Sequence, residues 1–312
     1  TTAMILYGIY VVFTVIEIIA LLIAGMPLFD SMTLTFGTVG TGGFGLLNSS
    51  IASYSTAVQI IITVFMIICS INFTVYYMFL IKRPKEALMC EEMRYYLLIV
   101  FGSALLIAFN IRASFASFGK AFQQAIFQVA SVISTTGFAT ADFNLWPEFS
   151  RMILVLLMFV GACAGSTGGG FKVSRLIIMV KSVRNEIMSV THPRSVQKVH
   201  MDGRRIPDNV VKTVLCYLAG YVVILIVSVL LISLDNFDMT TNFTAVMATF
   251  NNVGPGLNRV GPTGNFGGFS VLSKLVLMFD MLVGRLELYP MLVIFAPGLW
   301  RIHPHRHVGK VQ

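Results

Sequence analysis

The residues best suited to chemistry lie in three short loops rich in threonine, glycine and asparagine. The loops span residues 38–44, 134–140 and 251–256. Glycine readily adopts a positive φ, which allows a loop to turn successive carbonyl groups toward one axis. Carbonyl oxygens arranged in this way can replace the water shell of a monovalent cation. The loops therefore predict a cation-binding filter built from backbone oxygens.

The side chains of these loops are compatible with the same chemistry. Five of them carry an oxygen that could contact an ion or brace the loop, namely Thr38, Thr41, Thr135, Thr136 and Asn252. The three loops contain no Asp or Glu, which disfavours a divalent-cation site made from a ring of carboxylates. No His, Glu, Asp or Cys residues in the sequence have catalytic or metal-ligand spacing, so an enzyme is not expected.

One such loop alone is typical of an extracellular turn, so the preceding segments decide between the two interpretations. Each loop follows a helix-like segment too short to cross a membrane, at 26–39, 118–133 and 239–250. A short helix that enters a membrane and stops must bury its end in protein or water. The negative C-terminal end of that helix favours a nearby cation. Three loops at equivalent positions favour the filter.

A second candidate site is the glycine-rich stretch 161–172, which interrupts a long apolar segment. A glycine costs about 1 kcal/mol relative to alanine inside a helix, so three in succession predict a break. Irregular backbone at membrane depth requires protein or a water-filled cavity around it. We expect an unwound loop that lines a cavity, with a small-residue helix-packing face as the alternative. A nucleotide phosphate loop does not fit, because Phe171 separates Gly170 from Lys172.

Arg285 lies within the last apolar segment. A charge there costs about 2.5–3.5 kcal/mol on insertion scales, so Arg285 is expected to face a cavity or a partner. One interpretation is a structural ion pair or a side chain that reaches the cytoplasmic surface. Glu287 is nearby, but residues two apart do not share a helix face. The other interpretation is that Arg285 contacts the loop at 165–170 and helps to hold a pore shut.

The composition is that of an all-α, polytopic membrane protein. Of the 312 residues, 56% are hydrophobic and only 12% are charged, against about 25% charged in soluble domains. The net charge of +8 does not indicate nucleic-acid binding, because 14 of the 22 Lys and Arg lie at 82–94, 181–212 and 301–310, as in cytoplasmic loops. The connections at 26–55, 113–150 and 235–270 are then expected on the outer side, and the scattered cysteines predict no disulfide or metal site.

The same order of segments occurs three times. Apolar spans at 4–25, 93–111 and 210–234 precede the short segments, and segments at 56–81, 149–181 and 270–300 follow the loops. Alignment of Gly43, Gly137 and Gly254 gives separations of 94 and 117 residues. A cationic loop at 181–209 accounts for most of the difference. We therefore predict three repeats, at 1–85, 86–209 and 210–312.

Taken together, these segments resemble the TrkH/KtrB superfamily of potassium transporters. The matching stretches are T-G-G-F at 41–44, T-T-G-F at 135–138, A-G-S-T-G-G-G-F-K at 164–172, N-V-G-P-G at 252–256 and G-R-L-E at 284–287. The longer G-R-L-E-L-Y-P and the tail A-P-G-L-W-R favour the TrkH branch. The resemblance covers essentially the whole chain. It implies potassium-channel-like units around a pseudo-four-fold pore, each made of a span (M1), a short helix with its loop (P-loop) and a second span (M2). Three of the four units are expected in this chain, and the first unit is expected upstream of Thr1.

The resemblance also implies which residues form the filter and the gate. The filter is expected at Thr41, Gly42, Gly43, Thr135, Thr136, Gly137, Asn252, Val253 and Gly254. The gate is expected at Gly165, Ser166, Thr167, Gly168, Gly169 and Gly170, with Lys172 beside it and Arg285 facing it. The resemblance therefore implies that K+ ions are the metal bound, at the filter residues. No covalently bound cofactor is expected.

The leading hypothesis is potassium uptake by a multi-pass protein of the cell inner membrane. The resemblance implies a homodimer and a cytosolic nucleotide-binding regulatory subunit of the RCK (TrkA) type on the basic inner face. Channel-like flux and symport with H+ or Na+ both fit the sequence. The alternatives are Na+ or mixed Na+/K+ translocation by the same fold and a non-conducting membrane scaffold subunit.

Overall fold

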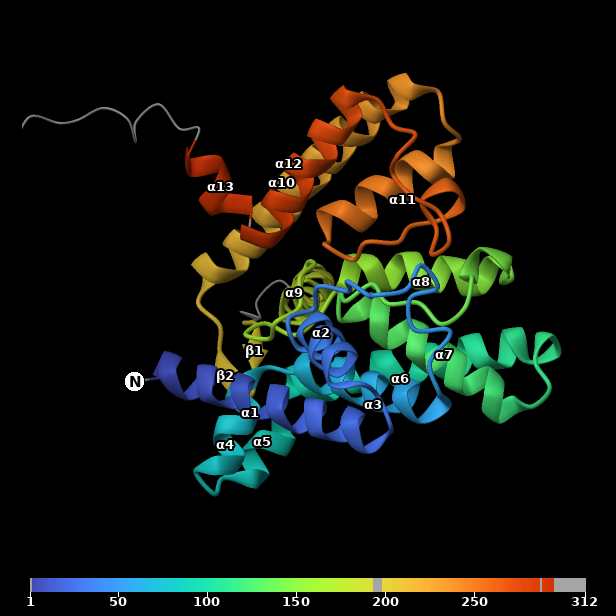
Figure 1. The fold of residues 1–312 in the computed structure, drawn as a ribbon. Helices are drawn as coiled ribbons and strands as arrows, with labels where there is room; N and C mark the ends of the chain where they lie inside the picture. The colour runs from blue at the N-terminus through green and yellow to red at the C-terminus, as the bar shows by residue number, and fades with distance from the viewer. Residues whose placement is uncertain (1, 193–197, 287, 295–312) are drawn as a thin grey trace, which may run out of the picture.

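The computed structural model describes residues 2–192, 198–286 and 288–294, which are mostly helical (Figure 1). Three long helices each precede a short helix, and a pair of helices follows each short one. The long helices are α1 (Thr2–Ile23), α6 (Glu91–Ile111) and α10 (Asp208–Ile232), and the short ones are α2 (Leu28–Val39), α7 (Phe118–Ile133) and α11 (Met239–Phe250). The pairs are α3 (Thr56–Cys69) with α4 (Phe73–Leu80), α8 (Glu148–Val160) with α9 (Val173–Thr191), and α12 (Val271–Leu286) with α13 (Leu288–Ile294). A further helix, α5 (Pro84–Met89), joins the first set to the second.

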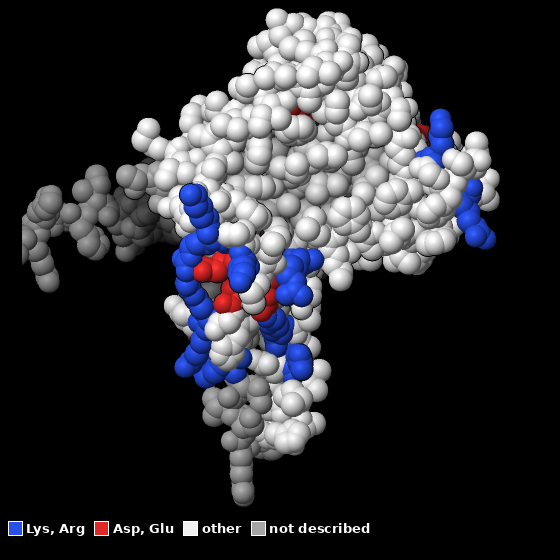
Figure 2. Space-filling view, turned by 90° about the horizontal axis from the view of Figure 1, so that it is seen from below, with Lys and Arg blue, Asp and Glu red and all other residues white. Residues whose placement is uncertain are grey.

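The described part of the chain has the surface of a membrane protein. Three segments are long and apolar enough to span a bilayer, Met4–Ile23, Glu91–Ser114 and Asp208–Asp235. Many large apolar side chains on these helices are exposed, such as Ile23, Leu98 and Leu230 at 82%, 69% and 63%. Figure 2 shows Lys and Arg gathered at two edges of the molecule, with a broad uncharged body between them. That distribution fits an apolar belt between two polar ends.

The short helices lie where the sequence predicts them. The bounds of α7 and α11 coincide with the predicted segments, and α2 begins two residues later than expected, after Pro27. Side chains cap two of the three N-termini: Ser117 accepts a hydrogen bond from the Lys120 N–H, and Asp238 accepts one from the Thr241 N–H. Such caps satisfy N–H groups that the first helical turn leaves without a partner.

The predicted span at 56–81 is not a straight helix. It consists of α3 and α4, which meet at an angle of 86°. Asn72 begins the new helix, because its side chain accepts a hydrogen bond from the Thr74 N–H at 2.9 Å. Short polar side chains can satisfy backbone groups outside a continuing helix, which allows a break without Gly or Pro.

The predicted cationic loop at 181–209 is wrong in part. Helix α9 continues to Thr191. Two short antiparallel strands follow, β1 (His200–Met201) and β2 (Arg204–Arg205). Lys181, on α9, donates hydrogen bonds to the Glu91 carboxylate and to the His200 carbonyl. These contacts hold the β1–β2 hairpin against α6 and α9.

The core is divided among the sets of helices. One apolar cluster lies mainly between α6, α7 and α8, a second between α1, α2 and α3, and two more surround α10 to α12. The outer loops of the second and third sets are linked by Asn144. Its amide donates to the Asn258 carbonyl, and its side-chain oxygen accepts from the Asn258 N–H. These contacts position the short helices and their loops around one region.

Candidate functional site

The three predicted filter loops have the same backbone conformation. Each begins with a non-glycine residue in the left-handed region, at Thr41, Thr135 and Asn252, where φ is 51°, 60° and 57°. Two residues later each has a glycine with positive φ, at Gly43, Gly137 and Gly254 (66°, 87° and 101°). Left-handed backbone is uncommon for residues with a side chain. Its occurrence at three equivalent positions identifies one structural unit used three times.

The hydrogen bonds of the loops repeat as well. In each loop two consecutive N–H groups donate to one carbonyl of the preceding short helix. The donors are Gly42 and Gly43 to Gly37, Thr136 and Gly137 to Ser131, and Val253 and Gly254 to Ala248, at 2.8–3.4 Å. The N–H groups are therefore turned back onto the helix. This arrangement leaves carbonyl oxygens as the polar groups with which the loops can bind an ion.

Neighbouring loops interlock through their backbones. A β-carbon on Gly43 would lie 1.8 Å from the Thr136 carbonyl oxygen, and one on Gly137 would lie 2.1 Å from that of Val253. In the part of the chain that the structure describes, no atom lies within 4 Å of the same position on Gly254. The loops are consecutive neighbours, and only glycine fits where two of them meet.

The loops line a cavity of about 820 Å³. Its wall includes eight of the nine predicted filter residues, Thr41, Gly42, Gly43, Thr136, Gly137, Asn252, Val253 and Gly254. The ninth, Thr135, faces the glycine-rich loop below. The structure thus brings the predicted filter residues together around one space.

Three polar side chains brace the loops. The Thr41 hydroxyl donates to the Thr167 carbonyl at 3.0 Å, and the Thr135 hydroxyl accepts from the Gly169 N–H at 2.6 Å. Asn252 donates to the Met281 carbonyl on α12 at 3.2 Å. These oxygen-bearing side chains could either contact an ion or brace the loop. At these three positions the geometry favours bracing.

The glycine-rich stretch 161–172 is an unwound segment between α8 and α9, as predicted, and the helix-packing alternative is excluded. Its two ends cross closely, since a β-carbon on Gly161 would lie 2.8 Å from the Gly170 Cα. The N–H groups of Lys172 and Val173 donate to the carbonyls of Val160 and Ala162, at 3.0 and 3.1 Å. Protein groups thus satisfy the irregular backbone.

The middle of this segment lies directly against the ends of the short helices. A β-carbon on Gly168 would be 2.9 Å from the Ser134 carbonyl oxygen, and one on Gly169 would be 2.9 Å from that of Asn251. Ser134 and Asn251 occupy equivalent positions, one residue before the left-handed residue of each loop. The segment therefore covers one end of the space that the three loops surround.

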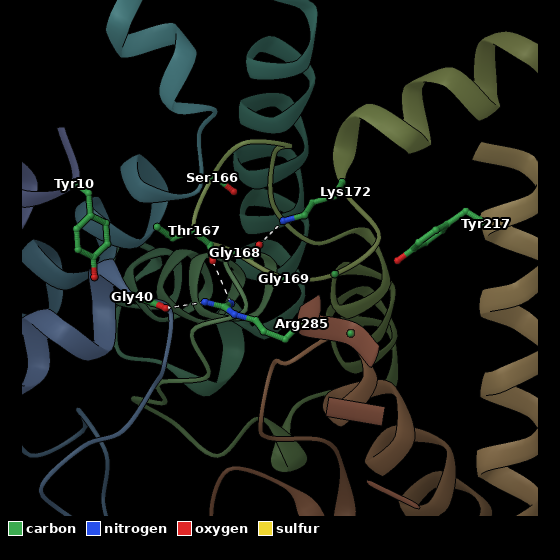
Figure 3. A pocket seen from close by; sticks show the side chains of 11 residues that line it. Tyr10, Gly40, Ser166, Thr167, Gly168, Gly169, Lys172, Tyr217 and Arg285 are labelled. Atoms are coloured by element: carbon green, nitrogen blue, oxygen red, sulfur yellow. Dashed lines mark hydrogen bonds between the residues drawn. The ribbon is translucent and has the colours of Figure 1, made fainter. Parts of the chain in front are cut away.

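Two cationic side chains lie at the same end (Figure 3). Arg285 donates from Nη1 to the Thr167 carbonyl at 3.2 Å and from Nη2 to the Gly40 carbonyl at 3.5 Å. Lys172 donates to the Gly168 carbonyl. All of these residues line a second cavity of about 520 Å³. The expected contact between Arg285 and the segment at 165–170 is present.

Arg285 lies in the last turn of α12. Glu287, considered above as a neighbour, and the tail at 295–312 are outside the described residues. Sequence reasoning missed Glu92 and Asn72, which contact the flanks of the unwound segment. The available signal was a carboxylate at the beginning of the apolar span of α6.

The fold and the site define a polytopic membrane transport protein with re-entrant loops around a central cavity. Residues 1–302 match the model of the TrkH family, described as cation transport protein. The chain belongs to the TrkH family, which confirms the predicted family and helical membrane fold.

Several relatives carry potassium in their names. The chain is 35% identical over 307 residues to the Trk system potassium uptake protein TrkH of Salmonella typhimurium, covering 96% of this chain and 62% of the relative. It is 30% identical over 282 residues to TrkG of Escherichia coli, covering 89% and 58%. The crystal structure of the potassium transporter TrkH from Vibrio parahaemolyticus superposes with a TM-score of 0.88 at 34% identity, covering 96% and 65%. The chain thus spans less than two thirds of the length of these relatives.

The contact between Gly137 and Val253 can be tested by its effect on stability. Gly137→Ala adds a left-handed alanine and a β-carbon 2.1 Å from a backbone carbonyl oxygen. Gly203→Ala adds only the left-handed conformation, since no atom of the described residues lies within 4 Å of its β-carbon position. We expect Gly203→Ala to cost about 1–2 kcal/mol, and Gly137→Ala at least twice as much. Thermal unfolding in detergent measures both, and equal losses would contradict the interlocked loops.

Proposed function

We propose that this protein takes up potassium across the cell inner membrane through a carbonyl-lined selectivity filter. The observation that carries the proposal is the interlocked set of three loops with equivalent hydrogen bonds and left-handed residues. The residues of the filter are those named above, and the bound species is K+. The names of the relatives support potassium as the substrate.

The loops would bind K+ by exchanging water oxygens for carbonyl oxygens. The short helices α2, α7 and α11 all end at the loops, so their negative C-terminal ends add a field that favours a cation. The open side at Gly254 is where a fourth loop would complete a pseudo-four-fold ring. By the family resemblance, a serine for glycine in that loop would permit Na+ or mixed Na+/K+ translocation.

The segment at 165–170 would act as the gate of this pore. It covers one end of the filter space. At the same end, the side chains of Arg285 and Lys172 donate hydrogen bonds to carbonyl oxygens. Fixed positive charges in a narrow passage form an electrostatic barrier to cations. Opening would require the segment to release at least the hydrogen bonds from Thr41 and Arg285 to Thr167.

The protein would be a homodimer with a cytosolic nucleotide-binding regulatory subunit of the RCK type. The cationic edge seen in Figure 2 supplies a surface for an acidic partner on the inner side. The flux would proceed either as in a channel or as symport with H+ or Na+.

Transport in a potassium-uptake-deficient strain tests the proposed function. The protein, expressed at its natural length with its regulatory subunit, is expected to restore growth at low K+ and to pass rubidium into liposomes. Potassium is also expected to raise the thermal unfolding temperature, because a bound ion stabilises the folded state by mass action. Neither flux nor K+-dependent stabilisation would identify a scaffold, and equal stabilisation by Na+ would favour the mixed-ion alternative.

Removal of the Arg285 side chain is expected to increase the basal leak. Arg285→Ala deletes two hydrogen bonds and a positive charge at the closed end of the filter space. Rubidium flux into liposomes without the regulatory subunit measures the leak. Arg259→Ala is the matched control, since Arg259 stacks on Phe237 and contacts none of the filter loops in the described residues. An unchanged flux would remove Arg285 from the gate.

A side chain at Gly169 is expected to open the gate without changing ion preference. A β-carbon there would lie 2.9 Å from the Asn251 carbonyl oxygen and 3.3 Å from the Thr135 hydroxyl, so Gly169→Val should push the segment away from the filter. Basal rubidium flux should rise several-fold, while the K+/Na+ ratio stays constant. Gly102→Val, on α6, is the control, because no described residue has an atom within 4 Å of the β-carbon position there. A changed ion ratio would place Gly169 in the filter instead.

A further inference from the structure

One buried carboxylate contacts both flanks of the segment at 165–170. Glu92 lies in the first turn of α6 and is 3% exposed. Its Oε1 accepts a hydrogen bond from the Ala164 N–H at 2.6 Å and another from the Ser174 N–H at 3.1 Å. Ala164 directly precedes the segment, and Ser174 is the second residue of α9. A single oxygen atom therefore accepts hydrogen bonds from residues on both sides of the segment.

The other oxygen of Glu92 contacts the break between α3 and α4. Its Oε2 accepts from the Asn72 side-chain amide at 3.5 Å. Two backbone hydrogen bonds join the same break to the segment: Cys163 N–H donates to the Ser70 carbonyl, and Phe73 N–H donates to the Gly165 carbonyl, at 3.0 and 3.1 Å. Glu92 thus lies where two unwound stretches from different sets of helices meet.

We propose that Glu92 is the positioning residue that holds the unwound segment in its closed position, an inference that rests on the proposed role of this segment as the gate. Hydrogen bonds to a carboxylate are shorter and stronger than those between neutral groups. The negative charge also lies at the N-terminus of α9, where the helix dipole favours it. A buried carboxylate that lost these donors would be left without compensation, so the closed arrangement is favoured over a displaced segment.

The same turn of α6 is held by the hairpin β1–β2. The Glu91 N–H donates to the Asp202 carboxylate at 2.7 Å, and Lys181 bridges the Glu91 carboxylate and the His200 carbonyl. Asp202 lies in the turn of the hairpin, between β1 and β2. A displacement of the hairpin would therefore move the backbone of Glu92 and, through its carboxylate, both ends of the segment. This gives a polar surface outside the apolar belt a direct connection to the gate.

The test compares a buried and an exposed glutamate. Glu92→Gln keeps the shape and the Oε1 acceptor but removes the charge and turns an amide donor toward Asn72. Glu86→Gln removes a charge on α5 whose carboxylate pairs with Arg83 at the surface. In the complete protein reconstituted into liposomes, we expect Glu92→Gln to raise basal rubidium flux by about tenfold relative to wild type, on the scale of one lost charge-assisted hydrogen bond, with the K+/Na+ ratio unchanged. Glu86→Gln should stay within about twofold of wild type, because an exposed ion pair contributes little and no hydrogen bond to the segment is lost.

A reciprocal exchange distinguishes a positioning role from general damage to the fold. Asn72→Asp keeps the cap on the Thr74 N–H and places a second carboxylate against Glu92, so it should also raise the basal flux. In the double variant Glu92→Gln/Asn72→Asp the amide donor and the carboxylate acceptor have exchanged places, so the contact between residues 72 and 92 is restored and the flux should fall below the combined effect of the two single variants. This result requires the specific pair, since two independent defects would add.

The outcomes separate this inference from the proposed function. Failure of the wild-type protein to pass rubidium would overturn the proposed function itself. Normal wild-type transport with unchanged or reduced basal flux in both single variants would overturn the role of Glu92, as would a double variant that leaks as much as the sum of its parents. If Glu92→Gln does not yield monodisperse protein, Asn72→Asp alone decides, because its cap and its volume are retained.

Discussion

The structure depends on two contacts between neighbouring loops. In each contact, the backbone of one loop occupies the space that a side chain on the preceding loop would need. Gly43 lies against the Thr136 carbonyl, and Gly137 against that of Val253. Both glycines also have positive φ, so conformation and space impose the same requirement. Closely packed backbone atoms cannot easily shift apart, so the spacing of each loop is fixed by its neighbours and not by that loop alone. The arrangement of the three loops is therefore a property of the set.

The second unusual feature is that two unwound stretches satisfy each other's backbone hydrogen bonds. The break between α3 and α4 supplies the Ser70 carbonyl and the Phe73 N–H, and the segment at 161–172 supplies the Cys163 N–H and the Gly165 carbonyl. Neither stretch could leave those groups unpaired in an apolar environment. The break at 70–72 therefore depends on a segment about ninety residues away in the sequence, and the two must fold together.

This mutual dependence explains which features the sequence predicts. The short helices α7 and α11 and the register of Gly43, Gly137 and Gly254 are local: apolar segments of limited length end at glycine-containing turns. The break at 70–72 has no Gly or Pro, and its cause is a partner from another set of helices. The role of Glu92 was equally hidden, because a glutamate in the first turn of a helix is ordinarily explained by the helix dipole. The division into repeats and the roles of the filter and gate residues stay predictions.

Charges of opposite sign hold the unwound segment from its two sides. Arg285 and Lys172 contact its carbonyl oxygens beside the cavity, and Glu92 contacts N–H groups at its flanks. Arg285 and Glu92 belong to α12 and α6, whereas Lys172 is the last residue of the unwound stretch itself. The cationic contacts differ from the anionic ones in one respect. A K+ ion would bind the same carbonyl oxygens to which Arg285 and Lys172 donate hydrogen bonds. It would make no favourable contact with the N–H groups that donate to Glu92. In the function proposed above, ion occupancy would therefore weaken the attachment on the cavity side, whereas the contact with Glu92 would remain.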